Sequence, residues 1–310
     1  MRNIELGTTG LQVSNVAQGL MRIDDKTDDQ IRDLYKTARD CGINFFDHAD
    51  IYGQTLHLCE TRFGDALNLG SSEREQIYLQ SKAGIVKDGP YFDFSAGHIV
   101  EAVEGSLKAL KTDYLDVLLL HRPDSLVEPE EVAAAFNKLE QSGKVRHFGV
   151  SNESPMYIEL LKTAVTQPLV ANQLQLSITH APIIAQGTTV NMVDEDQAIM
   201  RDGEVLSYSR IHRMTIQAWS PFQAGFFNGP FIGNPEYAEL NEVLDELATK
   251  YDATPEGVAI SWITSHPAKM QVVLGTTTPD RVRAAAGGSD IQLTRPEWYR
   301  LFRAAGHLVP

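Results

Sequence analysis

Short apolar runs alternate along the chain with stretches whose apolar residues recur at helical spacing. Apolar runs bounded by polar or glycine-containing segments are typical of buried strands, and helices placed between strands are typical of parallel sheets. The pattern therefore predicts eight strands separated by helices. The predicted strands are Val16–Leu20, Ile43–Phe46, Ile77–Gln80, Leu115–Leu120, His147–Val150, Leu169–Gln173, Thr215–Trp219 and Val272–Leu274.

Start and stop signals mark several of the predicted helices. The first helix opens with a capping box from Thr27 to Gln30, carries an apolar face that ends at Cys41, and stops at Gly42. Three other helices begin with a Ser or Thr cap followed by proline, which is preorganised for the first helical turn. These caps are Ser154-Pro155, Thr254-Pro255 and Thr278-Pro279, and further helical patterns cover Ile99–Leu110, Pro129–Gln141 and Thr294–Ala305.

This alternation favours an α/β fold, a (β/α)8 TIM barrel, over an open doubly wound sheet. No GxGxxG sequence follows the first strand, which also argues against a Rossmann domain. We expect residues 4–13 to form an N-terminal β-hairpin that plugs the barrel bottom, and the last helix to be an extra C-terminal element. The polar segment Ser177–Ser209 is expected to be an irregular loop over the C-terminal face. With no linker in evidence, we expect a single barrel domain over residues 1–310.

Composition narrows the classes of function. The formal net charge of −14 disfavours binding to nucleic acid, because an acidic chain repels phosphate backbones. No leader-like apolar segment and no run long enough for a membrane span is present, so we expect a cytoplasmic protein. Two cysteines lack metal-ligand spacing and suit a reducing compartment; Cys41 is expected to be buried and Cys59 to lie in a polar stretch. No metal site is expected, and the oligomeric state is left open.

Four polar residues end or follow three neighbouring strands, where the function of a barrel collects. They are Asp47, Tyr52, Lys82 and His121. A phenol has a pKa of about 10, and an adjacent ammonium lowers it and favours proton transfer. A carboxylate can hold that lysine, and a neutral imidazole can orient a carbonyl oxygen. Any one of these residues alone is usually structural, but together they can reduce a carbonyl with electrons from a cofactor.

Several long motifs resemble the aldo-keto reductase family. The segment 45–53, Phe-Phe-Asp-His-Ala-Asp-Ile-Tyr-Gly, is similar to the family signature FFDTADxYG, and 80–82, Gln-Ser-Lys, is similar to the family's lysine strand. The segment 118–124, Leu-Leu-Leu-His-Arg-Pro-Asp, is similar to its histidine strand, and 143–152 follows its GKVRxxGVSN pattern. Within the family, the chain looks most similar to the bacterial YdhF-like oxidoreductase branch. The resemblance implies that Tyr52 is the proton donor, Lys82 lowers its pKa, Asp47 pairs with Lys82, and His121 orients the substrate.

The same resemblance implies a site for NADPH, with NADH possible but weaker. Groups implied to surround the nicotinamide are Gly19, Met21, Ser151, Asn152, Gln173 and Trp219; those implied near the phosphates are Ser220, Phe222, Gly275, Thr276 and Arg281. The chain departs from many relatives at two places. Gly275 stands where they have lysine, and Ala284-Ala285 stands where they have Glu-Asn, so the pocket for the 2′-phosphate loses one cation.

The implied function is reduction of an aldehyde or ketone, a small-molecule carbonyl. One alternative is a non-enzymatic NADPH-binding regulatory subunit of the same fold, as in potassium-channel β subunits. Another is a metal-dependent hydrolase that uses His48, His121, Asp47 and Asp50, in which Lys82 would repel the metal. Aromatic side chains are expected to line the substrate pocket; they are Tyr91, Phe92, Phe94, Phe226, Phe227 and Phe231.

Overall fold

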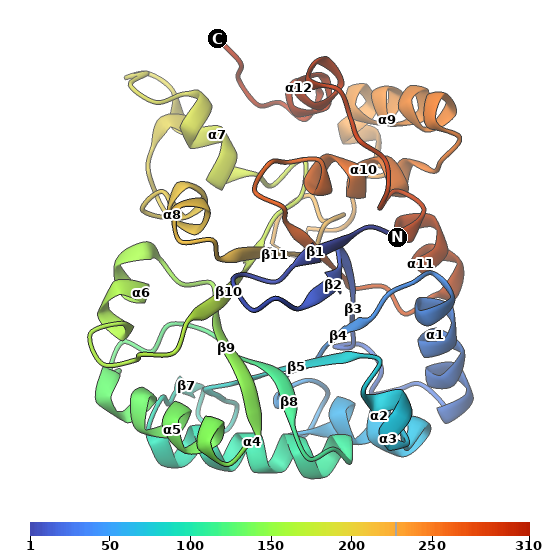
Figure 1. Ribbon diagram of the computed structural model, residues 1–310. Coiled ribbons are helices and arrows are strands. Elements are labelled where there is room, and N and C mark those ends of the chain that lie inside the picture. Colours follow the sequence, from blue (N-terminus) through green and yellow to red (C-terminus); the bar gives the residue numbers. More distant parts are fainter. Residues whose placement is uncertain (227) are drawn as a thin grey trace.

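A computed structural model describes residues 1–226 and 228–310. Eight parallel strands form a closed barrel in the order β3, β4, β5, β8, β9, β10, β11 and β12, with β12 returning to β3. Helices surround these strands as an outer ring (Figure 1). The TIM-barrel prediction is therefore confirmed. Strand bounds are β3 Val16–Gly19, β4 Phe45–Asp47, β5 Tyr78–Ala83, β8 Leu115–Leu120, β9 Val145–Ser151, β10 Leu169–Gln175, β11 Thr215–Trp219 and β12 Gln271–Leu274.

The helices of the ring follow the signals in the sequence. Thr27 and Gln30 form the predicted capping box of α1, and proline stands in the first turn of α6, α10 and α11. Helix α4 starts three residues earlier than predicted, because the Ser95 hydroxyl caps it. The bounds are α1 Asp28–Asp40, α2 Leu58–Leu67, α3 Ser71–Arg74, α4 Ala96–Leu110, α5 Pro129–Gln141, α6 Pro155–Leu161, α9 Ala238–Tyr251, α10 Pro255–Thr264, α11 Pro279–Ala286 and α12 Arg295–Ala304.

The N-terminal hairpin closes one end of the barrel. Strands β1 (Asn3–Glu5) and β2 (Gln12–Ser14) pair antiparallel and lie across the middle of the ring in Figure 1. Leu6 and Val13 are fully buried among inward side chains such as Phe45 and Val117, in a cluster separate from the core between strands and helices. The predicted hairpin is confirmed, and its apolar residues fill the barrel interior from below.

A layer of glutamines crosses the barrel above this plug. Gln271 donates from Nε2 to the Ser14 carbonyl at 2.7 Å, and Gln217 donates to Gln271 Oε1 at 2.8 Å. Gln217 Oε1 in turn accepts hydrogen bonds from Gln80 and Gln173, at 3.0 and 3.3 Å. The interior is thus apolar at the hairpin end and polar toward the C-terminal ends of the strands.

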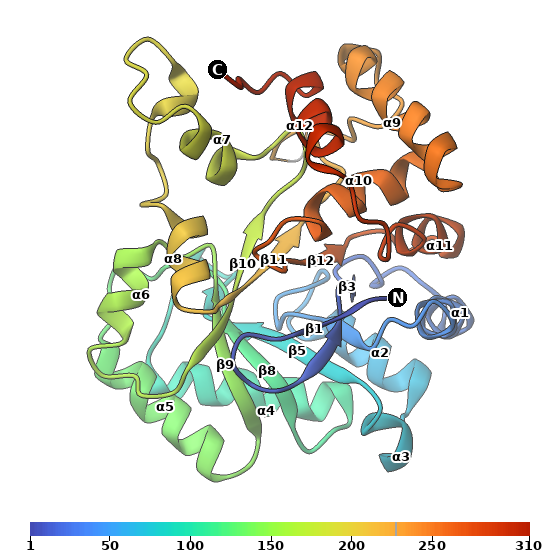
Figure 2. The ribbon, with the colours of Figure 1, turned by 45° about the horizontal axis from the view of Figure 1, so that its top comes forward.

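Segment 177–209 is more ordered than expected. It contains α7 (Pro182–Thr188), the 3-10 helix η1 (Asp196–Ala198) and the start of α8 (Val205–Ile211), so the prediction of an irregular loop was wrong. The C-terminal tail packs against this segment, where His307 Nε2 contacts the Ile178 carbonyl at 2.7 Å. Figure 2 shows α7 and the tail on the same side of the ring. No described helix is long and apolar enough to cross a membrane.

The cysteines also differ from expectation. Cys41 is only half-buried, because it is the C-cap of α1 rather than part of the apolar face. Cys59 is fully buried in α2, where the surrounding sequence is polar but the residue faces the core. Both thiols are free.

Candidate active site

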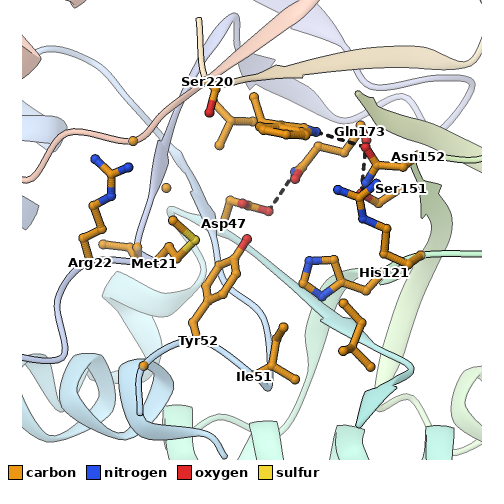
Figure 3. A pocket seen from close by; sticks show the side chains of 18 of the residues that line it. Met21, Arg22, Asp47, Ile51, Tyr52, His121, Ser151, Asn152, Gln173 and Ser220 are labelled. Carbon is orange, nitrogen blue, oxygen red and sulfur yellow. Dashed lines mark hydrogen bonds between the residues drawn. The ribbon is translucent and has the colours of Figure 1, made fainter. Parts of the chain in front are cut away.

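The four predicted catalytic residues converge at the C-terminal ends of the barrel strands. Asp47 ends β4, Lys82 lies in β5, and His121 directly follows β8. Tyr52 lies in the loop after β4, and this loop is anchored to β5 because the Asp50 amide donates to the Lys82 carbonyl at 3.1 Å. In Figure 3 the Tyr52 hydroxyl and the His121 ring point into the same cavity.

Lys82 is the centre of this group. Its fully buried ammonium donates to both carboxylate oxygens of Asp47 at 2.8 Å, to the His48 carbonyl at 2.7 Å and to Tyr52 Oη at 3.0 Å. Burial lowers the pKa of Lys82, but attraction to Asp47 and Tyr52 outweighs burial and raises the pKa overall. The lysine is therefore charged at neutral pH.

Tyr52 experiences two opposed influences. Burial raises the pKa of its phenol, whereas the charge and hydrogen bond of Lys82 lower that pKa. Burial is the larger of the two, so the pKa is raised overall. The phenol is consequently protonated at neutral pH, and Lys82 is placed to stabilise the phenolate that proton donation would leave.

His121 is neutral in this environment. Burial, together with the nearby charges of Lys82 and Arg122, lowers the pKa of the imidazole well below its usual value. Its ring lies 5.9 Å from the Tyr52 ring at 78°, and its buried Nδ1 has no hydrogen-bond partner among the described residues. A neutral imidazole at this place can donate a hydrogen bond to a carbonyl oxygen beside the phenol.

A cavity of about 420 Å³ lies above these groups. Asp47, Tyr52 and His121 line it, and Lys82 lies behind Tyr52. Eight predicted cofactor residues also line it: Gly19, Met21, Ser151, Asn152, Gln173, Trp219, Ser220 and Gly275. Arg22, Lys87 and Arg122 line it as well and were missed by the sequence reasoning, although Arg22 and Arg122 each directly follow a predicted site residue.

Three predicted cofactor residues do not line the cavity. Phe222 is half-buried and packs against the main core. The Thr276 carbonyl accepts a hydrogen bond from Gln18 Nε2 at 2.9 Å, at the edge of the site beside Gly275. Arg281 is exposed in the first turn of α11, and no described residue forms an ion pair or hydrogen bond with its guanidinium.

The residues expected around a nicotinamide are joined by hydrogen bonds. Trp219 Nε1 donates to Asn152 Oδ1 at 3.3 Å, Asn152 Nδ2 donates to Ser151 Oγ at 2.8 Å, and Gln173 Nε2 donates to Asp47 Oδ1 at 3.0 Å (Figure 3). Asn152 and Ser220 have φ angles of 62° and 54°, an uncommon conformation that is found more often at functional sites. An indole face with amide and hydroxyl groups at its edge fits a nicotinamide, whose carboxamide needs both donors and acceptors.

Most of the predicted aromatic wall is elsewhere. Phe94 and Phe231 are buried in the core, and Tyr91 and Phe92 are exposed on β7 (Tyr91–Phe92), which pairs with β6 (Ile85–Val86). Phe226 does line the cavity, edge-on to Trp219 with ring centroids 6.2 Å apart. Phe227 lies outside the described residues. The apolar wall is instead formed mainly by Leu20, Met21, Ile51, Ile85, Trp219 and Phe226.

A metal centre has no support in this geometry. Within residues 1–226 and 228–310, no group of three or more His, Cys, Asp or Glu side chains is arranged to hold a metal ion. His48 is fully buried against Phe63, and the Lys82 ammonium already contacts both oxygens of Asp47. A cation added there would be repelled by the lysine.

Comparison with known proteins agrees with the arrangement of the site. Residues 15–304 match the aldo/keto reductase family. The chain belongs to this family. The oxidoreductase YdhF of Escherichia coli is 34% identical over 100% of both chains, and a 6-dehydroglucose reductase of Agrobacterium fabrum is 34% identical over 95% of both. The holo form of aldo-keto reductase AKR11C1 from Bacillus halodurans is 25% identical, covers 100% of this chain and 98% of its own, and has a TM-score of 0.76.

These relatives make this chain an oxidoreductase and support the resemblance seen in the sequence. Potassium-channel β subunits from Schizosaccharomyces pombe and Oryza sativa also match, but at 28% identity. Proteins of this family bind NAD(P)H and act on small-molecule carbonyl compounds. The fit of Trp219, Asn152 and Ser151 to a nicotinamide is in keeping with that cofactor.

Proposed function

We propose that this aldo/keto reductase reduces an aldehyde or ketone to an alcohol with NADPH as its preferred cofactor and Tyr52 as the proton donor. The observation that carries the proposal is the 3.0 Å hydrogen bond between Lys82 Nζ and the Tyr52 hydroxyl at the cavity. A bound reduced nicotinamide supplies a hydride to the carbonyl carbon. Tyr52 donates its proton to the carbonyl oxygen, so that the product is a neutral alcohol.

Each remaining residue of the group has one task. Lys82 stabilises the Tyr52 phenolate by its positive charge, and Asp47 holds Lys82 in place through two 2.8 Å hydrogen bonds. His121, kept neutral, donates a hydrogen bond that orients the carbonyl oxygen toward Tyr52.

The nicotinamide end of the cofactor is assigned to residues that line the cavity, and its phosphate end to residues in and beside the cavity. Ser151, Asn152 and Gln173 would hold the carboxamide, and Trp219 would stack on the ring, next to Gly19 and Met21. Ser220 and Phe222 would flank the pyrophosphate. Gly275, Thr276 and Arg281 would hold the 2′-phosphate at the N-terminus of α11, where backbone N–H groups favour anions.

Two further expectations belong to the same proposal. We treat residues 1–310 as a single domain. The strands form one closed barrel, the N-terminal hairpin packs into its interior, and the C-terminal tail packs against segment 177–209. We also place the protein in the cytoplasm, which suits two free thiols.

The test is consumption of NADPH by purified protein over a panel of aldehydes, ketones and dicarbonyls. The panel includes 6-dehydroglucose, because one relative is a reductase of that compound. We expect saturable oxidation of NADPH with at least one substrate and slower oxidation of NADH. The Tyr52→Phe variant is the matched control, since it keeps the ring and removes only the hydroxyl. Absence of turnover across the panel, with NADPH bound, would favour the regulatory-subunit alternative.

A further inference from the structure

A second compartment adjoins the catalytic cavity. Its volume is about 330 Å³, and four residues line both spaces: Arg122, Asn152, Trp219 and Phe226. The rest of its wall comes from the end of β10, the loop after β9, and the segment 177–209. The two spaces are therefore neighbours on the same rim of the barrel.

Buried polar atoms without partners gather in this second compartment. Among the described residues, Glu153 Oε1, Glu153 Oε2, Gln175 Nε2 and Asp202 Oδ2 have no hydrogen bond and almost no exposure to solvent. The other oxygen of Asp202 is satisfied by Gln186 Nε2 at 2.5 Å. Buried polar atoms are normally paired, so several orphans at one cavity indicate that a ligand completes them.

Glu153 is the strongest of these features. Only 2% of its surface is exposed, and its backbone is fixed to Asn172 by hydrogen bonds in both directions, at 2.8 and 3.4 Å. Burial raises the pKa of its carboxyl to about 9, although the nearby Arg122 lowers that pKa. The group is consequently protonated at neutral pH and can both donate and accept a hydrogen bond.

Arg122 supplies donors at the junction of the two spaces. It directly follows the catalytic His121, is half-buried, and forms no hydrogen bond or ion pair with any described residue. Its charge is close enough to Glu153 to influence that carboxyl, yet no ion pair forms between them. A guanidinium left unpaired beside the reacting centre is available to a substrate.

The mixture of hydrogen-bond donors and acceptors in this compartment indicates which class of ligand it can bind. An anionic ligand would satisfy Arg122 and Gln175 but would face Asp202 Oδ2 and leave that oxygen unpaired. An apolar ligand would leave the unpaired atoms of all four residues without partners, which is costly in a buried space. A hydroxyl group both donates and accepts, so adjacent hydroxyls can pair with Arg122, Gln175, Glu153 and Asp202 together.

We propose that Arg122, Glu153, Gln175 and Asp202 form a subsite for a neutral hydroxylated extension of the carbonyl substrate. The inference rests on the proposed function, which places the reacting carbonyl between Tyr52 and His121. Because Arg122 lines both compartments, a hydroxyl bound by its guanidinium lies at their junction. The substrate class is therefore a polyhydroxylated aldehyde or ketone that spans both compartments.

The experiment compares three aldehydes of four carbons: D-erythrose, butanal and succinic semialdehyde. Values of kcat/KM are measured for the wild type, for Glu153→Leu and Arg122→Met, and for Glu101→Leu, an exposed glutamate on α4 outside both cavities. We expect the ratio of D-erythrose to butanal to fall about 10-fold or more in the first two variants, because each removes at least one buried hydrogen bond to a hydroxyl. The ratio should stay within about 2-fold in Glu101→Leu, since an exposed side chain outside the cavity has little effect.

Each other outcome is decisive. An unchanged erythrose-to-butanal ratio in Glu153→Leu overturns the subsite, and so does an equal loss for both aldehydes. A rise in kcat/KM for succinic semialdehyde alone in Glu153→Leu would show that the compartment binds an anion instead. If no aldehyde is reduced by the wild type, the proposed function has failed, and the subsite is judged by calorimetric titration with D-sorbitol. Binding that is lost in Glu153→Leu supports it, and no binding to the wild type overturns it. A melting temperature equal to or above that of the wild type verifies that Glu153→Leu is folded.

Discussion

The ammonium of Lys82 lies 3.0 Å from the phenol oxygen of Tyr52 and donates a hydrogen bond to it. The phenol itself is part of the wall of a 420 Å³ cavity, whereas the lysine is wholly buried behind it. A molecule in the cavity can therefore contact the Tyr52 hydroxyl without contacting the Lys82 ammonium. In the proposed reaction, this arrangement separates proton donation from charge stabilisation.

Replacing Tyr52 by phenylalanine removes the proton donor and keeps the ring. We expect kcat to fall about 100-fold or more, the usual scale for loss of a general acid, with the Kd for NADPH nearly unchanged. Steady-state kinetics and fluorescence titration measure the two quantities. Tyr91→Phe, an exposed tyrosine on β7, is the control and should behave as wild type. A Tyr52→Phe enzyme with near wild-type kcat would contradict the assignment.

Trp219 offers a spectroscopic test of cofactor position. Binding of NADPH should quench its fluorescence, with energy transfer to the reduced nicotinamide. Trp262 and Trp298 should contribute little, because they lie in α10 and α12 and do not line the cavity. Their ring centroids are stacked 4.8 Å apart, and each indole N–H donates to the other residue's backbone carbonyl. In Trp219→Phe the quench should largely disappear, and in Trp298→Phe it should persist. A full quench in Trp219→Phe would show that the indole does not contact the cofactor.

Arg281 should determine the preference for NADPH. A bidentate guanidinium–phosphate pair contributes roughly 1.5–3 kcal/mol, which corresponds to a roughly 10- to 150-fold preference over NADH. With one cation we expect the lower half of that range. Arg281→Ala should raise KM for NADPH, barely change KM for NADH, and flatten the salt dependence of NADPH binding. Equal weakening of both cofactors would mean that Arg281 supports the helix rather than the phosphate.

A gain of preference is expected at Gly275. A Cβ built on this residue meets no atom within 4 Å, and its φ is not in the left-handed region, so a longer side chain fits. Gly275→Lys should add a second cation near the 2′-phosphate and increase the preference for NADPH several-fold. Gly275→Met, of similar length but uncharged, is the control. A preference that rises equally in both variants would point to packing rather than charge.

Glu297 links stability to acid pH. Its carboxylate accepts hydrogen bonds from Thr294 at the start of α12 and from Tyr251 Oη at 2.8 Å, and it pairs with Lys250. Partial burial raises its pKa, but these hydrogen bonds outweigh burial and lower the pKa from 4.5 to about 2. A lowered pKa means that the stabilisation is complete above pH 4.5 and is lost as the pH falls toward 2.

Glu297→Gln should therefore lower the melting temperature at pH 7 by about 2–4 °C, because the amide can keep the capping box but loses the charge that strengthens the bonds to Lys250 and Tyr251. The difference between variant and wild type should shrink as the pH is lowered from 5 to 3, which scanning calorimetry can follow. Glu242→Gln on α9 provides an exposed control for the same change of charge. A difference that is constant with pH would exclude the carboxylate as its source.

The sequence predicts the barrel well because strand and helix periodicities are local. Leu115–Leu120 and Thr215–Trp219 are strands with the predicted bounds, since their apolar runs are bounded by polar residues. The predicted catalytic positions follow from the same register, which places Asp47, Lys82 and His121 at strand ends. Residue type alone, however, does not give side-chain direction in loops. Phe94 was expected at the cavity but fills the space left by Gly84, which has no side chain.

The second compartment could not be predicted for a related reason. Glu153 follows a family motif and looks like an ordinary polar loop residue, and only the packing around β10 buries it. Asp202 reaches the same space from a segment about 50 residues further along the chain. Such contacts depend on the path of segment 177–209. Helices α7 and α8 in this segment have no side-chain N-cap, so the sequence gives little indication of them. The position of Arg122 directly after His121 indicates that it lies near the site. The sequence around it does not show that its guanidinium lacks a partner.

The glutamine layer connects the carboxylate of Asp47 to the floor of the barrel, which matters for protein engineering. Gln80 and Gln173 both donate to Asp47 Oδ1, and through Gln217 and Gln271 the same chain of amides ends on Ser14 in the floor hairpin. The residues of this chain of amides lie in strands of the barrel and of the hairpin, not in the loops around the mouth. An engineered barrel would have to keep all of these amides, because loss of one would leave buried donors or acceptors unpaired next to the Asp47 carboxylate. Building this site into another barrel would therefore require the interior glutamine layer as well as the residues around the mouth.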